Sequence, residues 1–155
     1  MFYILDTNIL SDVLKYGLDR PQGRRVDAAP RANIKITIVT FEEMLAGRLL
    51  ELARDPKKVP RLEPLHVRYS LLQETFRELS RYYPPLPFDV GAQAIYDSIP
   101  AEARRKAAHD FRIAAIQVAL GRDYTVISRD QKDFQLIEKT LPMVQWEDWS
   151  IVTPP

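Results

Sequence analysis

The sequence contains no cysteine and only two histidines, His66 and His109. The absence of cysteine excludes a disulfide framework, a thiolate zinc site and a cysteine nucleophile. Two histidines are too few for a histidine-rich metal site. Any metal bound by this chain must therefore be held mainly by oxygen atoms, which favours a hard cation such as Mg²⁺, with Mn²⁺ as a substitute.

Long apolar runs and a strong net charge are also missing. No run approaches the roughly 20 apolar residues of a membrane span, and Asp6 arrives too early for a secretory signal, so we expect a cytoplasmic protein without membrane association. The net charge of +1 means that nucleic-acid binding would depend on local basic patches. The length of 155 residues and the 46% hydrophobic composition predict a single globular domain over residues 1–155.

Segments with strand-like and helix-like periodicity alternate along the chain. Strands are predicted at 2–5, 34–39, 86–88, 124–127 and 143–146. Helices are predicted at 7–16, 40–54, 61–83, 90–99, 108–120 and 130–139, the one at 108–120 deeply buried. Residues 17–33 lack periodicity and carry four arginines, which predicts a basic loop. This alternation predicts an α/β fold, a three-layer α/β/α sandwich with a central, mainly parallel sheet.

The predicted helix at 61–83 has a heptad-like apolar stripe. Such a stripe usually packs in a core or forms a dimer seam, and together with the apolar face of the first helix it predicts a homodimer. The stripe consists of Leu65, Tyr69, Leu72, Phe76, Leu79 and Tyr83.

Acids from separate segments are expected to meet at one edge of the sheet. In an open parallel sheet, ligands bind at the carboxyl ends of the strands, and each of these acids lies just after a predicted strand or in the first turn of a predicted helix. They are Asp6, Glu43, Asp110 and Asp130, with Asp133 three residues beyond the last.

Each acid also has a simple structural interpretation. Thr40 and Glu43 have the spacing of a capping box, and Asp110 suits the dipole at a helix N-terminus. Asp6 and Asp130 can each cap the helix that follows. Taken singly, these interpretations are favoured.

Taken together, the acids favour a metal site. Two carboxylates about 4 Å apart repel each other by roughly 4 kcal/mol at an effective dielectric near 20, so a cluster without a cation would be costly. Divalent cations turn this repulsion into coordination, and a pair of them can stabilise both the attacking and the leaving oxygen of a phosphodiester. This chemistry needs neither cysteine nor histidine.

Four segments resemble the motifs of the PIN-domain family, and within it the VapC-type ribonuclease toxins of bacterial toxin–antitoxin pairs. They are YILDTNILSDVL (3–14), ITIVTFEEMLAG (36–47), HDFRIAAIQVALG (109–121) and TVISRDQKDF (125–134), and the ending VQWEDW (144–149) is also similar. The resemblance implies a PIN-like fold and a metal-dependent endoribonuclease. It also implies a cognate antitoxin that fills the acidic groove, with an arginine on the carboxylates.

The resemblance also implies roles for individual residues. Asp6, Asp110 and Asp130 are the expected metal ligands, and counting back from Gly47 assigns the catalytic acid of the second motif to Glu43 rather than Glu42. Many relatives have asparagine at the position of Asp130, which leaves open whether Asp130 or Asp133 is the stronger ligand. The expected supporting residues are Thr7, Asn8, Ser128 and Asp133.

Basic residues have two interpretations that the sequence does not separate. Arg24 and Arg25, and Arg104 and Arg105, either follow an RNA backbone or are solvated surface charges. Arg112 and Arg129 flank two of the acids and are expected to pair with a carboxylate or to point to solvent. His109 is expected at the surface or beside a helix cap rather than as a ligand.

Three alternative functions compete with a toxin ribonuclease. One is a PIN-fold RNA-processing nuclease without an antitoxin, and another is a non-catalytic PIN-like RNA-binding module. The third is a phosphorylation receiver or acyl-phosphate phosphatase, which needs a lysine at the end of a late strand; neither 124–127 nor 143–146 ends in one.

Overall fold

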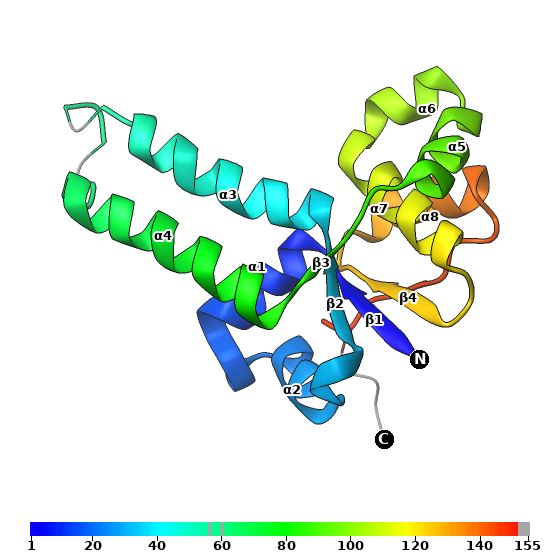
Figure 1. The fold of residues 1–155 in the computed structure, drawn as a ribbon, viewed down its shortest axis with the longest axis horizontal. Coiled ribbons are helices and arrows are strands. Elements are labelled where there is room, and N and C mark those ends of the chain that lie inside the picture. Colours follow the sequence, from blue (N-terminus) through cyan, green and yellow to red (C-terminus); the bar gives the residue numbers. More distant parts are fainter. Residues whose placement is uncertain (56, 60, 152–155) are drawn as a thin grey trace.

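The computed structural model describes residues 1–55, 57–59 and 61–151. Its sheet has the strand order β3-β2-β1-β4-β5, and each neighbouring pair is parallel (Figure 1). The strands are β1 (Phe2–Leu5), β2 (Ile34–Thr37), β3 (Pro85–Leu86), β4 (Tyr124–Ile127) and β5 (Trp146–Glu147). The helices are α1 (Thr7–Tyr16), α2 (Pro21–Ala28), α3 (Ile38–Ala53), α4 (Leu65–Tyr82), α5 (Val90–Ser98), α6 (Ala101–Lys106), α7 (Ala108–Leu120) and α8 (Gln131–Thr140).

The sheet separates two apolar cores. Successive strand residues point to opposite faces of a sheet, so Ile4 and Val126 pack with residues of α5, α7 and α8, whereas Leu5 and Ile127 pack with residues of α1, α2 and α4. Helices thus cover both faces, and the predicted three-layer α/β/α sandwich with a parallel sheet is confirmed. The predicted burial of α7 is also confirmed, since Phe111 and most of the apolar residues after it are buried.

The predicted basic loop over residues 17–33 is wrong. This segment contains α2, with a short 3-10 turn on each side. Pro21 occupies the first helical position, where its fixed φ is suitable. A side chain at Gly23 would not fit, because a Cβ there would lie 1.7 Å from the carbonyl oxygen of Gly17. The helix has no apolar stripe, because Val26 is its only buried large apolar residue, and periodicity therefore does not predict it.

The second strand is shorter than predicted, and the next helix begins earlier. α3 starts at Ile38, and its N-cap is Thr37, whose hydroxyl oxygen accepts the N–H of Thr40 at 3.1 Å. Thr40 is buried inside the helix, and its hydroxyl donates to the carbonyl oxygen of Leu5 at 3.3 Å. The predicted capping box of Thr40 and Glu43 is therefore wrong.

α3 and α4 form a hairpin that extends away from the sheet (Figure 1). Arg68 of α4 is buried, and its Nη1 donates to the carbonyl oxygen of Glu51 at 2.7 Å and lies 3.3 Å from that of Leu52. The guanidinium thus satisfies carbonyl groups at the C-terminal end of α3, which otherwise have no helical partner. This contact fixes the outer end of the hairpin.

The residues of the apolar stripe on α4 differ in burial from one end of the helix to the other. Leu79 and Tyr83 are buried in the core, whereas Leu65, Tyr69 and Phe76 are each more than half exposed. The predicted core role is thus confirmed only near the sheet. No helix in the described part of the chain is both long enough and apolar enough to cross a membrane.

Candidate active site

The carboxyl edge of the sheet brings the predicted acids into one region. Leu5 at the end of β1 and Ile127 at the end of β4 are register partners, so Asp6 and the loop 128–130 leave the sheet side by side. Glu43 of α3 lies near enough to raise the pKa of Asp6 through its charge. The predicted convergence of separate segments on this edge is therefore what the structure shows.

Asp6 is buried and receives hydrogen bonds on both carboxylate oxygens. As the N-cap of α1, it accepts the N–H of Thr7 on Oδ1 at 2.6 Å. Its Oδ2 accepts from Asn8 Nδ2 and from the Ser128 hydroxyl, each at 2.7 Å. Burial raises the pKa of Asp6 and outweighs the opposing effect of the hydrogen bonds from Ser128 and Thr7. The capping interpretation of Asp6 is thus correct, and it does not exclude a role in the cluster.

Ser128 organises the loop after β4. Its hydroxyl oxygen lies 3.1 Å from both Asn8 Nδ2 and the backbone nitrogen of Asp130, which each donate to it. Asp130 caps α8 by accepting the N–H of Asp133 at 3.2 Å. The predicted supporting residues Asn8 and Ser128 therefore lie around Asp6, and Asp130 begins the next helix beside them.

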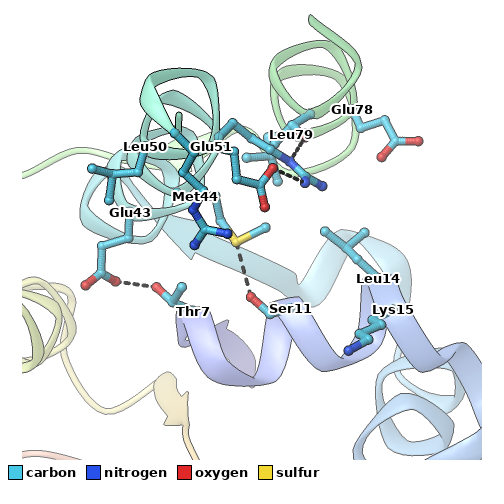
Figure 2. Close-up of a pocket in the computed structure, with 14 residues that line it drawn as sticks. Thr7, Ser11, Leu14, Lys15, Glu43, Met44, Leu50, Glu51, Glu78 and Leu79 are labelled. Carbon is cyan, nitrogen blue, oxygen red and sulfur yellow. Dashed lines mark hydrogen bonds and ion pairs between the residues drawn. The ribbon is translucent and has the colours of Figure 1, made fainter. Parts of the chain in front are cut away.

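Glu43 lies in the second turn of α3, facing α1 and α7. Its Oε2 accepts the hydroxyl of Thr7 (Figure 2). Its Oε1 contacts Nδ1 of His109. Thr7, a predicted supporting residue, thus contacts an acid of the cluster. The contact of His109 with Glu43 was not expected. The only signal for it in the sequence is its position directly before Asp110. Glu42, by contrast, is exposed.

Asp110, in the first turn of α7, has no hydrogen-bond partner for its carboxylate among the described residues. Burial is the largest cause of a pKa raised to about 7, and the negative charges of Asp6, Asp133, Glu43 and Asp130 raise it further. This pKa indicates that five carboxylates share one electrostatic environment.

The donor atoms of the cluster suit a metal ion, but their present positions do not suit one. In the described ranges, no three acid or histidine side chains lie close enough together to ligate one ion as they stand. The donors are nevertheless carboxylate oxygens, which hard divalent cations prefer. The raised pKa of Asp110 marks negative charge that a cation would neutralise. Binding an ion would require carboxylates of the cluster to turn toward it.

The predicted RNA-binding arginines lie outside the cluster. Arg24 donates to the carbonyl oxygen of Leu18 at 3.0 Å, and Arg104 contacts Asp97 at 3.4 Å. Arg105 is exposed on α6. Within residues 1–55, 57–59 and 61–151, none of these three arginines has a hydrogen bond or ion pair with the acids. Arg25 is half-buried, and its charge helps to lower the pKa of Asp148.

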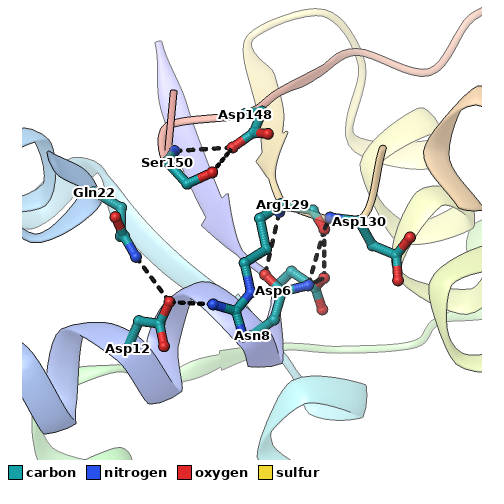
Figure 3. Close-up of polar contacts among 9 residues, drawn as sticks. Asp6, Asn8, Asp12, Gln22, Arg129, Asp130, Asp148 and Ser150 are labelled. Atoms are coloured by element: carbon teal, nitrogen blue, oxygen red, sulfur yellow. Dashed lines mark hydrogen bonds and ion pairs between the residues drawn. The ribbon is translucent and has the colours of Figure 1, made fainter. Parts of the chain in front are cut away.

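Two buried polar residues close to the cluster were not predicted. Asp12, one helical turn after Asn8, accepts from Gln22 Nε2 at 2.8 Å and from Arg129 Nη1 at 2.7 Å (Figure 3). The sequence does contain a signal for Asp12, because residues four apart share a helix face and Asn8 belongs to the site. The pairing of Arg129 with a carboxylate confirms one of its two predicted environments.

A groove of about 780 Å³ opens beside the cluster, between α1 and the α3–α4 hairpin (Figure 2). Thr7 and Glu43 belong to both the groove and the cluster. Leu14, Met44 and Leu50 make part of the wall apolar. The remaining lining residues are Ser11, Lys15, Gly47, Arg48, Glu51, Arg54, Thr75, Glu78 and Leu79.

Comparison with protein-family models gave no match, and neither did comparison with curated protein sequences. Solved structures are similar over nearly the whole chain. One is the complex of FitAB bound to an IR36 DNA fragment, with 21% identity, a TM-score of 0.72 and 99% of each chain covered. FitAcB from Neisseria gonorrhoeae has 24% identity and a TM-score of 0.67, and the match covers 97% of this chain and 100% of that one.

A third similar structure is VapBC-5 from Mycobacterium tuberculosis, a member of the VapBC family of toxin–antitoxin systems. It has 19% identity and a TM-score of 0.57, and the match covers 94% of this chain and 96% of that one. At these identities, the likeness establishes the fold. The PIN-like fold predicted from the sequence is thereby confirmed.

Proposed function

We propose that this chain is a metal-dependent endoribonuclease that cleaves RNA phosphodiester bonds, and that it is the toxin of a toxin–antitoxin pair. One observation carries the catalytic part of this proposal. Asp6, Glu43, Asp110 and Asp130 come from separate segments and gather at the carboxyl edge of the sheet, where burial and the neighbouring charges raise the pKa of Asp110 to about 7. Perturbed acids gathered at the carboxyl edge of a parallel sheet are typical of a catalytic site.

Asp6, Asp110 and Asp130 would hold Mg²⁺ or Mn²⁺, with Glu43 and Asp133 completing the negative charge around it. When bound, such an ion would supply positive charge against the phosphate and would lower the pKa of the attacking water molecule. The protein's own contribution is to hold these carboxylates together. Thr7 and His109 orient Glu43, while Asn8 and Ser128 orient Asp6.

The toxin part of the proposal depends on the partners. The similar structures are named as FitAB and VapBC complexes, and VapBC-5 belongs to a family of toxin–antitoxin systems. A cognate antitoxin is therefore the expected protein partner. The groove between α1 and the α3–α4 hairpin would accept a segment of it, because the groove combines apolar wall with charged residues and reaches the cluster at Glu43.

A homodimer is the expected assembly of the chain. We expect a dimer because α4 exposes an apolar surface at Leu65, Tyr69 and Phe76. Light scattering at tens of micromolar tests it, and a monomer at that concentration would contradict the dimer.

The decisive experiment incubates the purified chain with a panel of defined RNAs, with Mg²⁺ or with excess chelator. Cleavage is expected only with the divalent ion and is expected to fail in Asp110→Asn. The matched control is Asp123→Asn, an exposed aspartate at the opposite end of β4, which should cleave normally. Full cleavage in chelator would overturn the metal mechanism. RNA binding without cleavage would favour a non-catalytic module.

A further inference from the structure

The loop of residues 128–130 contributes two side chains to the cluster from one short segment. The Ser128 hydroxyl donates to Asp6 at 2.7 Å, and Asp130 follows two residues later at the start of α8. The backbone N–H of Asp130 also donates to the Ser128 hydroxyl. A shift of this loop would therefore move both side chains relative to Asp6.

Arg129 attaches this loop to α1 at two points. Its backbone N–H donates to Asn8 Oδ1 at 3.2 Å, and its guanidinium Nη1 donates to Asp12 Oδ2 at 2.7 Å. Figure 3 shows the side chain running toward Asp12 while Asp130 points the other way. The Asp12 side chain is only 12% exposed, so this ion pair is screened less than one between two solvated side chains.

Asp12 is itself held from a second direction. Gln22 of α2 donates to the same Oδ2 that accepts from Arg129. α2 in turn lies against the turn after α1, where Gly23 permits the close approach to Gly17. A buried acid with two fixed donors is a rigid anchor for the Arg129 side chain.

We propose that Arg129 is a positioning residue of the active site, which acts through its ion pair with Asp12. The pair holds the loop 128–130 against α1, so that Ser128 and Asp130 keep their places beside Asp6. The inference that this serves catalysis rests on the proposed ribonuclease function. A residue of this kind sets the turnover rate, whereas a phosphate-binding arginine would set the affinity for RNA.

The kinetic test uses Arg129→Gln, Asp12→Asn and the double variant on a defined RNA with Mg²⁺. Each single variant should lower kcat by about tenfold or more with KM within about twofold, because misplaced catalytic groups slow the reaction without weakening ground-state binding. The double variant should be no worse than either single variant. Arg129→Lys keeps the charge and should recover part of kcat. The matched control is Arg122→Gln, an exposed arginine before β4, which should leave both constants unchanged.

A second measurement needs neither metal nor activity. Amide hydrogen exchange of the metal-free protein should be about tenfold faster at positions 129 and 130 in Arg129→Gln and in Asp12→Asn. The amide of Val126, bonded to the carbonyl of Gln145, should be unaffected and reports whether the fold is intact.

These results separate the possible failures. A raised KM with normal kcat would make Arg129 a substrate-binding residue and overturn the proposal. Unchanged exchange at Arg129 and Asp130 would also overturn it, because the loop would then not depend on the ion pair. A wild-type chain that cleaves no RNA would overturn the proposed function instead, and the exchange data would still decide whether Asp12 and Arg129 hold the loop.

Discussion

Asp6 and Asp110 are the same residue type in the same cluster, and both have a raised pKa, yet their surroundings are opposite. Asp6 is 3% exposed and receives hydrogen bonds from the backbone of Thr7 and the side chains of Asn8 and Ser128. Asp110 is only partly buried and, within the described residues, accepts none on its carboxylate. The protein thus supplies donors for one acid and only further negative charge for the other.

The difference follows from where each acid sits in the fold. Asp6 lies between a central strand and a helix, so the first turn of α1 and the neighbouring loop after β4 both present donors to it. Asp110 projects from the first turn of α7 toward the other acids. Asp6 is therefore built into the scaffold, whereas the Asp110 carboxylate has no hydrogen-bond donor of its own among the described residues.

Substituting either aspartate should have its largest effect on RNA cleavage. Asp6→Asn and Asp110→Asn should each lower the rate of RNA cleavage by about 100-fold or more, because the proposed mechanism uses both carboxylates to hold the ion. Initial rates with saturating Mg²⁺ measure this. If either variant kept more than a tenth of the wild-type rate, that acid would not be a ligand.

Glu43 acts on both aspartates, because its charge raises the pKa of Asp6 and of Asp110. Glu43→Gln should lower cleavage by about tenfold or more, since an amide is a poorer ligand for a hard cation and charge is lost from the cluster. The exposed Glu42→Gln should cleave normally. If the two outcomes were reversed, the assignment by counting from Gly47 would be off by one residue.

Substituting the two aspartates should change the stability of the protein in opposite directions. In chelator near neutral pH, Asp6→Asn should lower the free energy of unfolding by about 1–3 kcal/mol, because an amide group cannot accept from all of its donors. Asp110→Asn should raise the melting temperature, because it removes a repelled charge that has no donors. Thermal melts decide this, and a loss of stability in both variants would show that the two acids are equally built into the scaffold.

The last expected effect concerns pH. The folded pKa of Asp110, about 7, lies above its ordinary value of 3.8, so the folded protein holds this proton more tightly than the unfolded chain does. Stability of the metal-free protein should therefore fall as the pH rises from about 4 to about 7 and level off above that. Asp110→Asn should flatten the decline. An equally steep decline in that variant would assign it to other groups.

The sequence predicted those parts of the molecule that local patterns determine. The strands at 2–5 and 124–127 and the buried helix at 108–120 have patterns long or apolar enough to be identified, and the acids follow from their ends. α2 was missed because its burial depends on Gly23 and Val26 rather than on an apolar stripe. Its close contact with Gly17 is set by tertiary structure.

The part of the site that escaped prediction consists of partners distant in sequence. Glu43 and His109 are separated by 66 positions, and Asp12 and Arg129 by 117. One sequence shows which side chains can pair but not which of them meet. The capping role given to Thr40 failed for a related reason, since Thr37, three residues earlier, satisfies the same helix end.

The continuity of α3 has a mechanical consequence for Glu43. From Ile38 to Ala53 the helix is an arm about 24 Å long, and Glu43 lies about 8 Å from its inner end. If the arm turned as one body about its inner end, a displacement at its tip would reach Glu43 reduced about threefold. A pull of about 3 Å on the hairpin would move the carboxylate by about 1 Å, a misplacement that can cost a reaction about 100-fold. The hairpin would in this way connect a force at its outer end to the position of Glu43 in the acidic cluster.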